Sequence, residues 1–113
     1  MKRLVVQTRK FSETLDKLIA QNKATKGDYE ELEKRLIENP SEGDIMQGTG
    51  GLRKTRLKSS GKGKSGGFRV CYYDASENER LFFIALFAKN EQENLTAEQK
   101  QILKGLVTRL KKE

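Results

Sequence analysis

The sequence contains no histidine among its 113 residues. This absence removes the most frequent general base, the most frequent metal ligand and the serine–histidine and cysteine–histidine pairs of many hydrolases. The aspartates and glutamates show no cluster with the spacing of a metal site. We therefore expect no metal and no other cofactor, and any chemistry must use other side chains.

Cysteine and long apolar runs are also scarce. The one cysteine, Cys71, cannot form a disulfide within the chain, which suits a reducing compartment, and we expect its side chain to pack in the interior. The longest apolar run, Leu81 to Ala88, is far shorter than the ~20 residues that cross a bilayer. The stretch Leu4-Val5-Val6 is too short for a signal peptide. These features predict a cytoplasmic protein with no membrane partner.

Acidic residues are missing from one long segment. Between Ile45 and Tyr73 there is no aspartate or glutamate, whereas seven basic residues occur: Arg53, Lys54, Arg56, Lys58, Lys62, Lys64 and Arg69. Removing these seven from the 23 basic residues leaves 16, which equals the number of acidic residues, so the net charge of +7 lies in this segment. Such a concentration favours a local surface for an anionic partner, although a solvated run that aids solubility is the alternative.

Apolar periodicity predicts one α+β domain over residues 1–113. A short strand from Lys2 to Gln7, centred on Leu4-Val5-Val6, begins the chain. Two amphipathic helices follow, from Phe11 to about Asn22 and, after a turn at 23–27 and an Asp28/Glu31 capping box, up to Asn39. Loops are expected at 41–51 and 59–67, and a Thr96/Gln99 capping box precedes the last helix. Strands are expected at 52–58, 68–74 and 81–88. The predicted order is β-α-α-β-β-β-α, a small antiparallel sheet with the helices packed on one face.

The basic segment predicts a strand–loop–strand with a cationic face. Residues two apart in a strand share a face, so Lys54, Arg56 and Lys58 should project together, and antiparallel pairing can bring Arg69 beside them. Such a face can bind phosphates. The competing interpretation is an edge strand that carries lysines to prevent aggregation, which explains one or two lysines better than seven cations without an acid.

A cationic face of this kind can support RNA cleavage without metal or a protein nucleophile. The 2′-hydroxyl of RNA can attack the adjacent phosphate, provided that charge on the phosphorus oxygens is stabilised and protons are moved at the 2′- and 5′-oxygens. Arginine suits the first task because it stays charged and binds phosphate with two parallel hydrogen bonds.

Two segments of the sequence resemble a known family. The run GTGGLRKTRLKSSGKGKSGGFRVCYYD, from Gly48 to Asp74, resembles the HigB branch of the RelE/ParE toxin superfamily, and Ala88-Lys89-Asn90-Glu91 resembles the segment after that family's last central strand. The resemblance implies a RelE-like fold and a ribosome-dependent mRNA endonuclease that inhibits translation. It also implies a cognate antitoxin, through which the toxin reaches operator DNA only indirectly.

The resemblance assigns roles to individual residues. Lys54 matches the family's general base, and Arg56 and Arg69 match its phosphate and transition-state contacts. The family's later arginine falls at Asn90 and an aromatic residue falls near Thr96, so no proton donor to the leaving group is assigned. Candidates to compensate for the missing charge are Lys89, placed in the catalytic set, and Lys62 and Lys64. The expected RNA- or ribosome-binding residues are Arg53, Lys58, Lys62, Lys64 and Asn90.

Two other functions fit parts of the sequence. A ParE-like toxin would inhibit DNA gyrase by binding, but such toxins generally lack the basic catalytic set. A regulator that binds nucleic acid without catalysis is the second alternative, and the absence of a helix-turn-helix pattern counts against it. A neighbouring gene for a short DNA-binding protein would favour the toxin.

Overall fold

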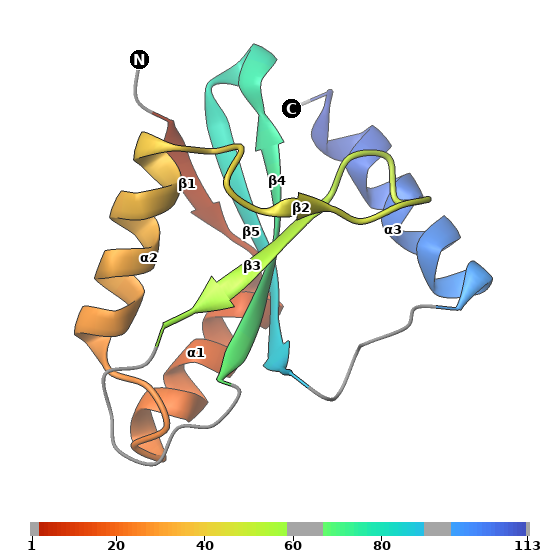
Figure 1. The fold of residues 1–113 in the computed structure, drawn as a ribbon. Helices are drawn as coiled ribbons and strands as arrows, with labels where there is room; N and C mark the ends of the chain where they lie inside the picture. The colour runs from red at the N-terminus through yellow and green to blue at the C-terminus, as the bar shows by residue number, and fades with distance from the viewer. Residues whose placement is uncertain (1–2, 59–66, 90–95, 113) are drawn as a thin grey trace.

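A computed structural model of the chain describes residues 3–58, 67–89 and 96–112. In this part, five strands form one sheet in the order β1-β5-β4-β3-β2, and three α-helices accompany it (Figure 1). The elements are β1 (Leu4–Gln7), α1 (Arg9–Ala20), α2 (Lys26–Glu38), β2 (Asp44–Ile45), β3 (Arg53–Leu57), β4 (Phe68–Ala75), the 3-10 turn η1 (Ser76–Asn78), β5 (Arg80–Ala88) and α3 (Ala97–Leu110). The α+β class is confirmed. Strand β1 runs parallel to β5 and the other strand pairs are antiparallel.

The helices cover both faces of the sheet, so the expectation of helices on one face is wrong. Helices α1 and α2 pack on one face, where Leu36 and Phe83 belong to one apolar cluster. Helix α3 packs on the opposite face, where Val107 joins a second cluster with Cys71 (Figure 1). The physical reason is that β4 and β5 carry apolar side chains on both faces, and each face has to be covered from water.

Helix α2 begins earlier than its sequence suggested. Thr25 is the N-cap, and its hydroxyl accepts a hydrogen bond of 3.0 Å from the Asp28 amide, while the Asp28 carboxylate accepts one of 3.0 Å from the Thr25 amide. The expected Asp28/Glu31 box and the turn reaching Gly27 are therefore wrong, because Asp28 is already the third helical residue. The box formed by Thr96 and Gln99 at the start of α3 is confirmed.

The segment predicted as a loop at 41–51 contains the short edge strand β2. The buried Tyr72 hydroxyl donates to the Pro40 carbonyl at 2.8 Å and accepts from the Gly43 amide at 2.9 Å, which fixes the segment against β4. A Cβ atom on Gly43 would lie 2.8 Å from the Lys54 carbonyl oxygen and 2.9 Å from the Tyr72 hydroxyl. Glycine is therefore required where the segment enters the sheet, and Asp44 then pairs with Lys54.

Candidate nucleic-acid interface and active site

The register of four strands arranges the candidate residues in two rows. Directly opposed residues point to the same face of a sheet, as do residues two apart along one strand. The first row runs across β5, β4 and β3 as Phe87, Arg69 and Arg56. The second row, on the same face, runs across β5, β4, β3 and β2 as Ala85, Cys71, Lys54 and Asp44. Lys54, Arg56 and Arg69 are thus neighbours, as the strand periodicity predicts.

These three cations line an open pocket at the β2–β3–β4 end of the sheet. Its volume is about 300 Å³, and its described lining consists of Glu42, Gly43, Asp44, Lys54, Thr55, Arg56 and Arg69. Arg56 is exposed, and Lys54 and Arg69 are half-buried, so their charged ends can reach a ligand from a rigid strand pair. An arrangement of three cations around a small open hollow suits one phosphate group and its flanking oxygens.

A hydrogen-bonded ion network supports β3 from the side of α2. The Arg35 guanidinium donates to both Glu42 carboxylate oxygens, at 2.9 and 2.8 Å, to a Glu31 carboxylate oxygen, and to the Arg56 main-chain carbonyl at 2.6 Å. The Thr55 hydroxyl donates to Glu42 at 2.7 Å. The guanidinium therefore joins α2 to the strand that carries Lys54 and Arg56, and fixes the position of that strand relative to α2.

The charge state of Glu42 follows from this network. Burial alone would raise the pKa of its carboxyl, but hydrogen bonds from Thr55 and Arg35 and the charges of Arg35 and Lys58 outweigh burial. The net result is a pKa lowered from the ordinary value, so Glu42 is the ionised partner of Arg35.

Glu42 and Asp44 were not among the residues expected from sequence, and neither was Arg35. Each lies outside the acid-free segment. The pairing of β2 with β3 brings Glu42 and Asp44 to the pocket, and the packing of α2 on β3 brings Arg35 to Glu42. A local signal existed for Asp44 alone, since it directly precedes the acid-free segment.

The other expected binding residues are dispersed. Arg53 lies on the face opposite Lys54, and its guanidinium donates to the main-chain carbonyls of Gly43, at 2.6 Å, and Ser41, at 3.3 Å. Lys58 is exposed just beyond β3, and Lys89 is exposed just beyond β5. Lys62, Lys64 and Asn90 lie outside the described residues.

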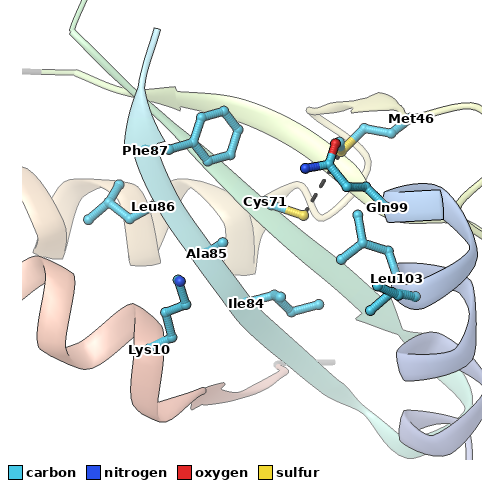
Figure 2. Close-up of a pocket in the computed structure, with 10 residues that line it drawn as sticks. Lys10, Met46, Cys71, Ile84, Ala85, Leu86, Phe87, Gln99 and Leu103 are labelled. Carbon is cyan, nitrogen blue, oxygen red and sulfur yellow. Dashed lines mark hydrogen bonds between the residues drawn. The ribbon is translucent and has the colours of Figure 1, made fainter. Parts of the chain in front are cut away.

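Cys71 is a packing residue, as expected. Its side chain is buried, its thiol lies 3.9 Å from the Met46 sulfur (Figure 2), and burial raises the pKa of the thiol to about 12. The thiolate is the nucleophilic form of cysteine, so this thiol is unsuited to nucleophilic chemistry near neutral pH.

Within ranges 3–58, 67–89 and 96–112, there is no group of three or more cysteine and acidic side chains that could hold a metal ion. No helix in these ranges is both long and apolar enough to cross a membrane.

Comparison with protein families gives one finding: the model of the family described as the RelE toxin of the RelE/RelB toxin–antitoxin system matches residues 5–113. The matched range contains the whole β2–β5 sheet region and the pocket that it forms.

Proposed function

The chain belongs to the RelE toxin family of toxin–antitoxin systems, and from this premise we propose that it is an endoribonuclease that cuts mRNA on the ribosome and stops translation. The observation that carries the proposal is the clustering of Lys54, Arg56 and Arg69 around one open pocket. The three groups come from two paired strands, so their spacing is set by the sheet and not by a loop.

The chemistry requires one RNA phosphate in this pocket. The 2′-oxygen attacks the adjacent phosphorus, the P–O5′ bond breaks, and the products are a 2′,3′-cyclic phosphate and a 5′-hydroxyl. The amine of Lys54 in its unprotonated form accepts the proton from the 2′-hydroxyl, and a protonated Lys89 is our candidate to return one to the 5′-oxygen. Arg56 and Arg69 stabilise the charge that grows on the non-bridging oxygens, so their effect is largest in the transition state.

Binding involves a wider set of residues than cleavage. We assign Lys58, Lys62, Lys64, Arg53 and Asn90 to contacts with mRNA or ribosomal RNA, and expect each to add affinity without taking part in proton transfer. Of these five residues, Arg53 faces away from the pocket, and its guanidinium is engaged by two main-chain carbonyls on the other face.

The partners follow from the family and from the charge. Family membership implies a cognate antitoxin. We propose that the antitoxin neutralises the toxin in the cytoplasm, and that the toxin meets operator DNA only as part of that complex.

The test is expression in a bacterial host with and without the cognate antitoxin, followed by mapping of mRNA 5′ ends. Wild-type protein alone should arrest growth and produce new 5′ ends confined to translated regions, and co-expression of the antitoxin should abolish both effects. Lys54→Ala should remain folded, and its expression should cause neither growth arrest nor new mRNA 5′ ends. The proposal is wrong if folded wild-type protein without a partner leaves growth and mRNA intact, or if Lys54→Ala cuts as well as wild type.

A further inference from the structure

A second cavity lies beside the cationic pocket, mainly on the same face of the sheet, with Leu86 and Lys10 of α1 contributing from the other face. Its volume is about 310 Å³, and its described lining is Lys10, Met46, Cys71, Ile84, Ala85, Leu86, Phe87, Gln99, Ile102 and Leu103 (Figure 2). Strand β5 forms its floor, the first half of α3 forms one wall, and Cys71 and Met46 close it on the side of β4. Most of this lining is apolar, and among the described lining residues there is no acid.

The cavity exists because α3 packs unevenly. Val107 and Leu110, near the end of the helix, are buried, whereas Ile102, near its start, is 67% exposed although it lines the cavity. The helix therefore anchors its last two turns on the sheet and leaves an apolar space under its first two. An exposed isoleucine beside buried aliphatic walls indicates a space suited to an apolar ligand group.

The two rows of the sheet place this cavity directly beside the phosphate-binding cations. Phe87, in the cavity, is the register partner of Arg69, and Cys71, also in the cavity, is the register partner of Lys54. Neighbouring strands are about 4.8 Å apart. A group bound against Phe87 is thus one strand away from Arg69 and two strands away from Arg56, a separation that matches a base and the phosphate of the same nucleotide.

We propose that this cavity holds the base of one mRNA nucleotide next to the scissile phosphate. This inference rests on the proposed function. The phosphate lies on Arg56 and Arg69, and the unstacked base lies against Phe87 and Ala85. Single-stranded RNA is recognised in this way, with splayed bases packed on aromatic side chains and their edges hydrogen-bonded.

The rim of the cavity supplies donors to the edge of the base. The Gln99 carboxamide oxygen accepts a hydrogen bond from the Thr96 amide in the capping box, so the group offers its NH₂ to a ligand. Lys10, from α1, contributes an ammonium group to the lining (Figure 2). Every nucleobase carries ring-nitrogen or carbonyl acceptors, and the same nucleotide carries a phosphate for the adjoining cations. The donors, together with the adjoining cations, favour a nucleotide over an apolar antitoxin residue.

The proposal is tested by single-turnover cleavage of mRNA on programmed ribosomes, with an abasic site placed on either side of the scissile phosphate. At one of these two positions, loss of the base should slow cleavage by wild type on the order of 10-fold to 100-fold. Ala85→Leu, which fills the floor of the cavity, should slow cleavage of intact mRNA by a similar factor. Its cleavage rate should not fall further on the abasic mRNA. Phe87→Leu serves as a second variant if Ala85→Leu does not fold.

The control variant is Leu4→Ala, which removes another exposed apolar side chain, in β1, and should behave as wild type on both substrates. If wild type cuts intact and both abasic mRNAs equally fast, the base-binding proposal is wrong while the proposed function stands. If folded wild type cuts no mRNA at all, the proposed function itself fails. If Ala85→Leu cuts normally but escapes inhibition by the antitoxin, the cavity binds an antitoxin side chain instead, and the proposal is overturned.

Discussion

Arg35 is the residue on which the geometry of the cationic pocket depends most, although it does not line the pocket. Its side chain is 14% exposed and it joins Glu42 to the Arg56 main chain. Arg35→Ala should lower the free energy of unfolding by about 1–3 kcal/mol, because it leaves a half-buried carboxylate and a carbonyl without their donor. Cleavage at a temperature where the variant is fully folded should still fall, since β3 is no longer held. Arg35→Lys keeps the positive charge but loses the paired N–H donors of the guanidinium, so its stability and cleavage rate should lie between those of wild type and Arg35→Ala.

The same network predicts a dependence of stability on pH. Because the pKa of Glu42 is lowered in the folded protein, the network stabilises the fold above the unfolded-state pKa of Glu42, and this contribution is lost as the pH falls through the folded-state value. The stability difference between wild type and Arg35→Ala should therefore shrink on acidification. Urea denaturation at a series of pH values measures it. A difference that stays constant into strong acid would contradict the assigned role of Glu42.

Individual residues were predictable from sequence where the signal was local. The positions of Lys54 and Arg56 on one face follow from the period of a strand, and the place of Arg69 follows from simple antiparallel pairing. Arg35 and Glu42 were not predictable, because the contacts of Arg35 with Glu42 and Arg56 bring together residues 7 and 21 positions apart. A solvent-facing arginine on a helix looks the same in the sequence whether or not it reaches a neighbouring strand.

At the scale of elements, the start of α2 offers a clean test of local structure. Thr25→Ala removes the hydroxyl that accepts from the Asp28 amide, and should lower the free energy of unfolding by about 0.5–2 kcal/mol. Cleavage should be unchanged at a temperature where the variant is folded, because Thr25 caps the start of α2, whereas Arg35, which contacts β3, lies near the end of that helix. Lys26→Ala, at the adjacent exposed position, is the matched control and should change stability little. Equal stability of Thr25→Ala and wild type in chemical denaturation would show that the cap is not formed.

Strand β2 and the position of α3 escaped prediction for different physical reasons. Strand β2 has two exposed residues, too few for any periodicity, and it is held in place by Tyr72 and the close approach at Gly43. The position of α3 was misjudged because a single apolar stripe does not say which face of a sheet it covers. The information was in β5 instead, whose run from Leu81 to Phe87 is apolar on both faces and therefore requires a layer on each.

At the scale of the whole molecule, the excess positive charge should dominate binding of RNA. With about four phosphate contacts, counterion release from single-stranded RNA gives roughly a 50-fold loss of affinity between about 50 and about 200 mM salt. The measurement is a titration with an RNA that carries a 2′-deoxy group at the cleaved nucleotide, which prevents 2′-oxygen attack. Arg56→Ala, which removes one phosphate-binding cation, should reduce the slope of log affinity against log salt by about 0.7. An affinity that barely changes with salt would exclude a surface that binds phosphates.

The central claim is that Lys54 and Arg69 are needed for cleavage, whereas binding is shared among many cations. Single-turnover cleavage of mRNA on programmed ribosomes, with binding followed in parallel, should be about 10²–10⁴-fold slower for Lys54→Ala, while binding falls far less. Arg69→Ala should also lose most of its cleavage rate, because charge stabilisation acts chiefly in the transition state. Lys34→Ala, an exposed lysine on α2, is the control for loss of one charge. If folded Lys54→Ala and Arg69→Ala cut mRNA at the rate of Lys34→Ala, the cationic pocket is a binding surface and not an active site.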